Sequence, residues 1–169
     1  MHHRQTFLHH APGLLLLLLL LLLVIAIPSC FSFSLPREGK VAVPRIINGE
    51  EQEHEIWYKL VRPMTLTSKQ ALPLVVLHGG PGVPSDYLFP LSQLEYRSVL
   101  FYDQLGCGRS DAPPFNEKTY SIEASVEDLQ RVLKAVGITG RYHLLGQSFG
   151  GMLAFEHVLD LEKKRRASA

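Results

Sequence analysis

One serine in this chain lies between two glycines in a spacing that suits nucleophilic chemistry. The segment Gly146-Gln147-Ser148-Phe149-Gly150 follows a short apolar run, Tyr142 to Leu145, and precedes an apolar stretch with helical spacing. A strand, a sharp turn and a helix would leave the Ser148 hydroxyl raised above the sheet, and the two glycines would remove Cβ atoms that collide there. The pattern predicts that Ser148 attacks a carbonyl carbon and forms an acyl-enzyme. The alternative is a serine that caps the helix after an ordinary turn.

A glycine-rich loop after an earlier strand would complete such a site. His78-Gly79-Gly80-Pro81-Gly82 follows the continuous apolar run Leu72 to Leu77, which fits a strand buried on both faces. The oxygen that becomes negative during acyl transfer needs two N–H donors, which we assign to Phe149 and Gly80, with Gly79 and Gly80 against the substrate. The loop could instead be a plain tight turn. No GK[ST] or G-x-G-x-x-G is present, so a phosphate-cradling or dinucleotide loop is excluded.

The elements that must hold these loops alternate between strands and helices. Residues 97–102 predict a second buried strand, residues 87–94 a short helix capped by Ser85 or Asp86, and residues 122–136 an amphipathic helix from the Ser121 cap to Gly137. Residues 38–62 predict two strands with a turn at Asn48-Gly49, followed by a longer solvated loop over the charged run 50–55. Strands and helices in this order predict an α/β fold with a parallel sheet.

Three motifs in this order resemble the prolyl aminopeptidase (proline iminopeptidase) family of α/β-hydrolases: HGGPG after one strand, DQLGCGRSD after the next, and GQSFGG at the strand–turn–helix around Ser148, which we call the elbow. The resemblance covers residues 38–158 and implies an α/β-hydrolase fold with a mostly parallel sheet and flanking helices. It also implies a cofactor-free serine peptidase that releases an N-terminal residue, often proline, using Ser148 with Gly80 and Phe149 as oxyanion donors. Leu105 stands where many members carry a basic or aromatic residue, and Phe149 where many carry tryptophan. These two departures leave the substrate preference open.

Three further residues near the motifs receive a structural interpretation. Asp103 and Arg109 are expected to fix the loop that follows their strand. Cys107 lies between two glycines and could be taken for a thiol nucleophile, but no partner base is evident beside it.

The N-terminal segment has the composition of a secretory leader. Ten consecutive leucines, Leu14 to Leu23, follow Arg4 and precede Pro28, and no acidic residue occurs before Glu38. We therefore expect residues 1–34 to be a cleaved signal peptide and the protein to enter the secretory pathway, with an uncleaved membrane anchor as the alternative. From Leu35 onward the formal charges cancel, so neither nucleic acid nor a polybasic membrane contact is indicated, and no metal-ligand spacing occurs.

The residues after the elbow do not supply the rest of a catalytic triad. An α/β-hydrolase presents serine, then an acid, then histidine along the chain. The one later histidine, His157, is about 13 Å further along the same helix, so we interpret it, Glu156 and Asp160 as ordinary helix-face residues. The family's lid, with the acidic group that binds the substrate's amine, is also absent.

We therefore expect a C-terminally truncated chain with a partial hydrolase domain, residues 35–160, and a charged divergent tail, residues 161–169. Tyr142 to Leu145 would form an unpaired apolar edge, and the isolated chain would fold poorly and lack efficient turnover. The sequence predicts a serine aminopeptidase acting on a peptide or amino-acid amide without cofactor or metal. The alternatives are a non-catalytic fragment, or an esterase or amidase of the same fold.

Overall fold

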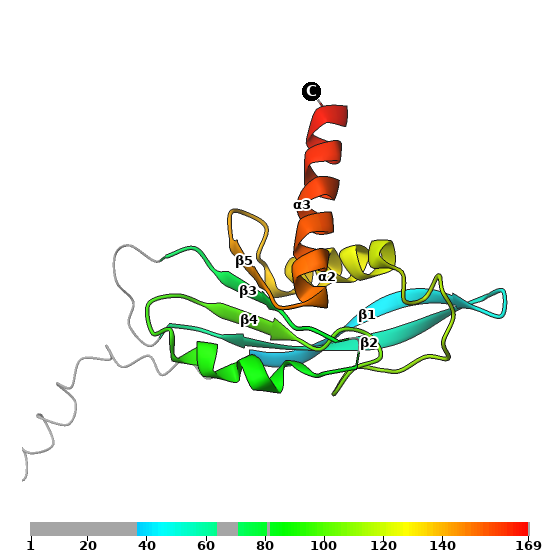
Figure 1. Ribbon diagram of the computed structural model, residues 1–169, viewed down its shortest axis with the longest axis horizontal. Helices are drawn as coiled ribbons and strands as arrows, with labels where there is room; N and C mark the ends of the chain where they lie inside the picture. Colours follow the sequence, from blue (N-terminus) through cyan, green and yellow to red (C-terminus); the bar gives the residue numbers. More distant parts are fainter. Residues whose placement is uncertain (1–36, 64–70, 81, 169) are drawn as a thin grey trace, which may run out of the picture. The chain divides into compact units, whose positions relative to one another are not determined.

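A computed structural model of the chain describes residues 37–63, 71–80 and 82–168. Met1–Phe33 and Ser34–Ala169 are separate units, and the expected leader, residues 1–34, lies outside the described residues. Five strands form one sheet in the order β1-β2-β4-β3-β5 (Figure 1). The elements are β1 (Arg37–Ile47), β2 (Glu50–Val61), β3 (Leu74–Leu77), the 3₁₀ helix η1 (Ser85–Gln93), β4 (Val99–Tyr102), α2 (Ile122–Val136), β5 (His143–Gly146) and α3 (Phe149–Ala167).

Strands β1 and β2 form a long antiparallel hairpin. Asn48 and Gly49 both adopt positive φ, 53° and 86°, which confirms the predicted two-residue turn. The prediction of a solvated loop over residues 50–55 is wrong, because β2 begins at Glu50 and pairs with β1 from its first residue. Most side chains of this segment are exposed, so the strand extends its charged groups into solvent and loses the alternation that usually marks a strand.

The described sheet is mixed rather than mostly parallel. β3 pairs in parallel with both β4 and β5, whereas β2 pairs antiparallel with β4 and with β1. The three parallel strands all point the same way, and their carboxyl ends continue into the three motif loops. Open α/β sheets bind their ligands at this carboxyl end of the strands.

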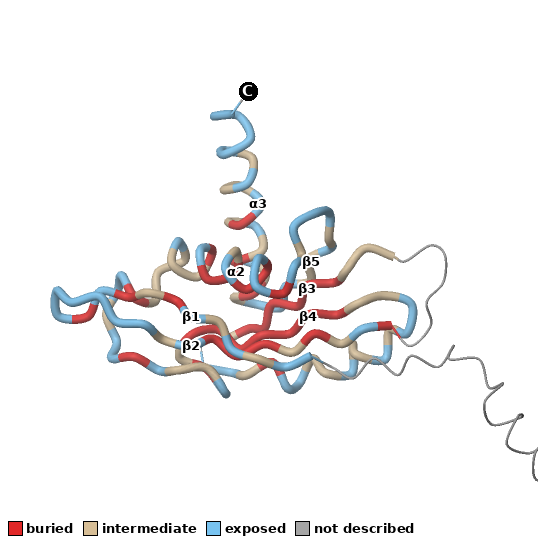
Figure 2. Tube along the Cα trace, turned by 180° about the vertical axis from the view of Figure 1, so that it is seen from behind, coloured by how far each residue is buried: buried red, intermediate tan, exposed pale blue. Residues whose placement is uncertain are grey.

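Helices cover both faces of the sheet (Figure 1). On one face, Leu129 and Val132 of α2 and Leu153 of α3 join a cluster with alternate residues of the strands, including Val75 and Tyr102. On the other face, η1 packs over a second cluster. There the rings of Phe89 and Phe101 meet edge-on with centroids 5.1 Å apart. The buried positions concentrate in β3 and β4, which fixes the strands that carry the motif loops (Figure 2).

One of the two predicted helix caps is present. The Ser121 hydroxyl accepts from the N–H of Ala124 at 3.1 Å, and Gly137 ends α2 with φ 82°, as predicted. The cap predicted for residues 87–94 is wrong, because Pro84 occupies the N-cap of η1 and no side chain caps it. The hydroxyl and the N–H of Ser85 are instead both donated to the buried carboxylate of Asp103.

The last helix, α3, continues through most of the segment expected to be a tail and ends at Ala167. Several apolar side chains along it are exposed, namely Met152, Phe155, Val158 and Leu161. Within the described residues β5 pairs with β3 alone, so it lies at an edge of the sheet. None of the helices in the described ranges is both long enough and apolar enough to cross a membrane.

Candidate active site

The turn between β5 and α3 holds Ser148 in a strained backbone conformation. Its φ is 52° and its ψ is −119°, a region that residues with a Cβ rarely occupy and that costs about 1–3 kcal/mol. Ser148 is the N-cap residue of α3, yet its side chain makes no capping hydrogen bond within the described structure. The hydroxyl is exposed at the carboxyl edge of the sheet. The geometry is therefore that of a nucleophile elbow and not of a helix-capping serine.

The two glycines of the motif make this turn possible. A Cβ atom on Gly146 would lie 2.3 Å from the carbonyl oxygen of Gly150, and one on Gly150 would lie 2.0 Å from that of Leu77. Gly151 differs, since a Cβ there would meet its nearest neighbour at 3.7 Å, an ordinary contact. The steric reason inferred from the sequence for Gly146 and Gly150 is confirmed.

The loop after β3 lies directly against the elbow. A Cβ atom on Gly79 would be 3.1 Å from the carbonyl oxygen of Gln147 and 3.2 Å from the Cβ of Ser148, so no side chain fits between the two loops. Gly80 has φ 124°, a conformation that L-residues with side chains rarely adopt. The structure thus brings Ser148, Phe149 and the glycine loop together, and the N–H groups of Phe149 and Gly80 have no acceptor among the described residues.

His78 joins the loops that follow β3 and β4. Its Nδ1 lies 2.7 Å from the carbonyl oxygen of Gly79, and its Nε2 accepts from the N–H of Gln104 at 2.8 Å. These two bonds require the tautomer protonated at Nδ1. Burial lowers the pKa of His78, and this desolvation outweighs the hydrogen bond to Gly79 that acts in the other direction. His78 is therefore a neutral structural histidine and does not act as a base for Ser148.

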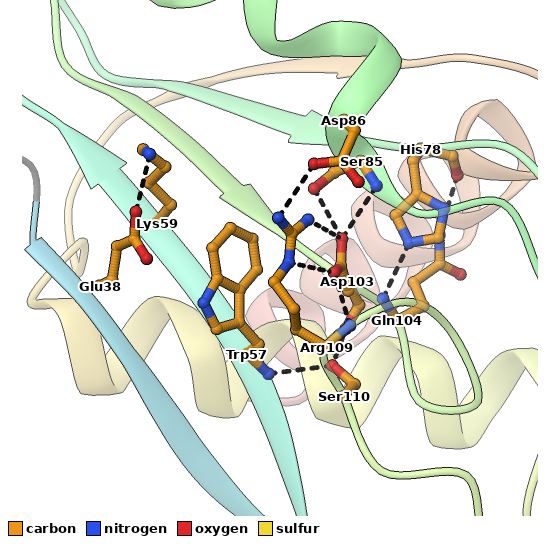
Figure 3. Close-up of polar contacts among 10 residues, drawn as sticks. All are labelled: Glu38, Trp57, Lys59, His78, Ser85, Asp86, Asp103, Gln104, Arg109 and Ser110. Atoms are coloured by element: carbon orange, nitrogen blue, oxygen red, sulfur yellow. Dashed lines mark hydrogen bonds and ion pairs between the residues drawn. The ribbon is translucent and has the colours of Figure 1, made fainter.

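Asp103 is the centre of a buried polar network beneath the site (Figure 3). Its carboxylate accepts from the N–H and hydroxyl of Ser85 at 2.9 and 2.7 Å and from the Nε of Arg109 at 2.9 Å. Burial alone would raise the pKa of Asp103, but the hydrogen bonds from Arg109 and Ser85 together hold it below its ordinary value. The Arg109 guanidinium stacks 3.7 Å from the ring centroid of Trp57. The loop-fixing role predicted for Asp103 and Arg109 is confirmed, whereas Ser85 and Trp57 were not identified from the sequence.

Cys107 is buried and its sulfur accepts a hydrogen bond from the N–H of Gly82 at 3.2 Å. Burial raises the pKa of the Cys107 thiol above its ordinary value. A buried thiol that stays protonated is a poor nucleophile, so Cys107 is a structural residue of the loop.

His157 is bonded to Tyr142 and not to Ser148, in line with its interpretation as a residue outside a triad, but it is buried rather than on an open helix face. His157 is 1% exposed, and its Nε2 lies 2.7 Å from the hydroxyl of Tyr142. Burial lowers its pKa. Asp160, by contrast, pairs on the helix surface with Lys164 at 2.7 Å. Across the described ranges, no histidine is hydrogen-bonded to the Ser148 hydroxyl.

A cavity of about 440 Å³ adjoins the elbow. Leu105 and Phe149, the two positions at which the resemblance leaves the substrate preference open, both line it. Its polar wall includes Asp128, which is buried in an ion pair with Arg45. In the part of the chain that the structure describes, no three His, Cys, Asp or Glu residues are placed to hold a metal ion.

Comparison with known proteins agrees with this geometry. Residues 73–165 match the alpha/beta hydrolase fold family. The proline iminopeptidase of Saccharolobus solfataricus is 43% identical over 110 residues, which cover 64% of this chain and 34% of the relative. That of Lactobacillus crispatus is 37% identical over 110 residues, 63% of this chain and 36% of the relative. The matched part thus spans about a third of the length of these relatives.

Solved structures show the same similarity. The proline iminopeptidase of Mycobacterium smegmatis superposes with a TM-score of 0.58 at 35% identity, over 72% of this chain and 38% of that one. A proline iminopeptidase-related protein from Thermus thermophilus has a TM-score of 0.56 at 31% identity, over 72% and 40%. Because the family model matches more than half of the chain, this chain belongs to the alpha/beta hydrolase fold family, and within it the chain is similar to proline iminopeptidases.

Proposed function

We propose that this chain carries the nucleophile of a serine aminopeptidase-type hydrolase that releases an N-terminal residue, often proline, from a peptide or amino-acid amide. The observation that carries the proposal is the strained, uncapped Ser148 beside two N–H groups without acceptors. The Ser148 oxygen attacks the carbonyl carbon of the first peptide bond. The carbonyl oxygen becomes negative and accepts from Gly80 and Phe149, the amine of the remaining peptide leaves, and water then hydrolyses the acyl-enzyme.

Two donors at this position have a large effect on such a reaction. Losing one typically costs about 3–4 kcal/mol of transition-state stabilisation, equivalent to a few hundredfold in rate. Phe149 N–H and the first turn of α3 also direct the positive end of the helix dipole at the developing charge. Both donors are backbone N–H groups, so no side chain has to move for them to act.

The described residues do not supply the general base of this mechanism. Attack by a serine hydroxyl requires a group that takes its proton, and both histidines of the site region are committed elsewhere, His78 to the loops and His157 to Tyr142. With the contacts of the described residues alone, Ser148 therefore reacts slowly and efficient turnover is not expected. A fragment that binds without catalysis is the competing proposal.

The substrate preference is assigned to the cavity beside the elbow. Leu105 and Phe149 both line this cavity. Different residues at these two positions therefore change the shape and polarity of the same pocket. The names of the relatives support proline-containing substrates. An esterase or amidase of the same fold is distinguished by comparing matched proline amides and proline esters.

The test combines a serine-directed probe with these substrates. The full chain and the Ser148→Ala variant are treated with a fluorophosphonate, and the adduct is located by peptide mapping. We expect slow labelling at Ser148 alone and very little release from proline amides. Folded protein that remains unlabelled would favour the non-catalytic fragment, and ester hydrolysis well above amide hydrolysis would favour the esterase.

We also propose that residues 1–34 direct the protein to the secretory pathway and are then removed. The support is the leucine run between a basic start and Pro28. Sequencing the N-terminus of protein collected from the medium of expressing cells tests this. A mature chain that begins near residue 35 is expected, and full-length protein retained in membranes would indicate the anchor instead.

A further inference from the structure

The hydroxyl of Tyr87 connects the two loops that form the site. Tyr87 lies on η1 and its hydroxyl accepts from the N–H of Gly79 at 2.8 Å. The same hydroxyl donates to the side-chain oxygen Oε1 of Gln147 at 2.8 Å. Gly79 belongs to the loop after β3, and Gln147 immediately precedes Ser148 in the elbow. One hydroxyl group therefore spans both loops and uses its donor and its acceptor in doing so.

This bond determines which N–H groups of the glycine loop remain free. The N–H of Gly79 is committed to Tyr87, whereas that of Gly80 has no acceptor among the described residues. A Cβ on Gly79 would lie 2.2 Å from Gln147 Oε1, which shows how closely the loop is held to the elbow. The hydroxyl thus fixes the distance between the donor at Gly80 and the donor at Phe149.

The helix that carries Tyr87 is itself anchored beneath the site. Ser85, two residues earlier, donates its N–H and its hydroxyl to Asp103, and Asp86 pairs with Arg109 at 2.9 Å. Phe89, two residues later, packs edge-on against Phe101 of β4. The Asp103 network in Figure 3 therefore holds the start of η1, and η1 presents Tyr87 to the two loops.

We propose that Tyr87 is a positioning residue for the oxyanion donors: its hydroxyl holds the glycine loop in register with the nucleophile elbow. This inference rests on the proposed function of Ser148. It predicts a role for a tyrosine that does not touch the reacting atoms, and it assigns to Gln147 the role of acceptor for Tyr87.

The test uses the full chain with Tyr87→Phe, which removes only the hydroxyl. Tyr96→Phe is the matched control, because Tyr96 is also exposed and its hydroxyl has no partner among the described residues. Labelling by the fluorophosphonate is followed over a range of probe concentrations. We expect the maximal rate to fall about five- to tenfold in Tyr87→Phe, with the half-saturating concentration unchanged and the control equal to wild type.

Gln147→Leu removes the acceptor of the same hydrogen bond and provides a second variant. If the two residues act through one contact, the double variant Tyr87→Phe/Gln147→Leu is slowed no more than the slower single variant. Multiplied effects in the double variant would overturn the proposal, as would a Tyr87→Phe rate within twofold of wild type.

Amide hydrogen exchange gives a readout that does not need a reactive serine. Exchange at Gly79 should accelerate in Tyr87→Phe because its N–H loses its acceptor. Exchange at Gln147, whose N–H is bonded to the Leu77 carbonyl at 3.1 Å, should also accelerate if the elbow is released. Faster exchange at both amides supports the positioning role of Tyr87 even if wild-type protein is not labelled. The missing label would then count against the proposed function alone. Unchanged exchange at Gln147 in Tyr87→Phe would overturn the positioning role.

Discussion

Replacing either of two adjacent glycines at the start of α3 by alanine should change the free energy of unfolding in opposite directions. In Gly150→Ala the new Cβ would lie 2.0 Å from the Leu77 carbonyl oxygen, well short of the 3.4 Å at which ordinary contact begins. The obstacle is backbone of the central strand β3 and cannot rotate away, so α3 must shift by more than an ångström or β3 must bend. Overpacking of this kind costs about 3 kcal/mol, at the upper end of its usual range.

Gly151→Ala adds the same methyl group one residue later without a clash, because the nearest atom is 3.7 Å away. Alanine is the better helix former, so this variant should gain about 0.5 kcal/mol in the free energy of unfolding. The two variants are chemically identical and differ only in the position of one methyl group. Any difference between them therefore reports the close approach of α3 to β3.

Urea unfolding monitored by tryptophan fluorescence measures both variants. Trp57 is the only tryptophan of the chain and is buried against Arg109 beside the site, so its emission reports this region. We expect the unfolding free energies of the two variants to differ by about 3–4 kcal/mol, with Gly150→Ala also unlabelled by the fluorophosphonate because Ser148 and Phe149 are displaced. Variants that agree within about 0.5 kcal/mol would refute the packing described here.

Three further predictions concern the residues around the site. Asp103→Asn should lower the free energy of unfolding by about 3 kcal/mol at neutral pH, measured by urea unfolding, because it weakens the charged hydrogen bonds to Arg109 and Ser85. The folded-state pKa of Asp103 lies below its unfolded value, so its contribution to stability is fully present above about pH 4 and is lost as the pH falls through the folded pKa. The free energy of unfolding should therefore fall less steeply with acid in Asp103→Asn than in wild type. An equal pH dependence of the two proteins would contradict this. Ser121→Ala should cost about 1 kcal/mol in the same assay through loss of the α2 cap, whereas a neutral result would mean that water replaces the hydroxyl. Cys107 should react with a disulfide reagent far more slowly in native than in urea-unfolded protein, and equal rates would show that the loop around it opens readily.

The parts of the site that sequence predicted are those fixed by local backbone geometry. The G-x-S-x-G spacing identifies Gly146 and Gly150: a Cβ on Gly150 would meet the Leu77 carbonyl of β3, and one on Gly146 would meet Gly150 within the motif itself. The same holds for Ser121 and Gly137 at the ends of α2, where capping needs particular residue types at particular positions. Motifs of this kind carry their structural reason within a few residues.

The features that sequence did not predict depend on contacts between distant segments. Ser85 is an ordinary N-cap residue in sequence, but a buried carboxylate 18 residues later offers its hydroxyl a stronger bond. His157 is an ordinary residue of the helix face in sequence, yet it is buried and its ring is hydrogen-bonded to the hydroxyl of Tyr142. Tyr87 has no local signal for its contact with Gln147, 60 residues away.

The central claim is that Ser148, Gly80 and Phe149 form one site for an acyl-transfer transition state. A crystal structure of the chain after reaction with a fluorophosphonate tests it most directly, because the phosphonyl oxygen marks the position of the oxyanion. We predict phosphorus bonded to the Ser148 Oγ, with that oxygen about 2.7–3.1 Å from the backbone nitrogens of Gly80 and Phe149. An adduct on another residue, or a phosphonyl oxygen directed away from both nitrogens, would contradict the account.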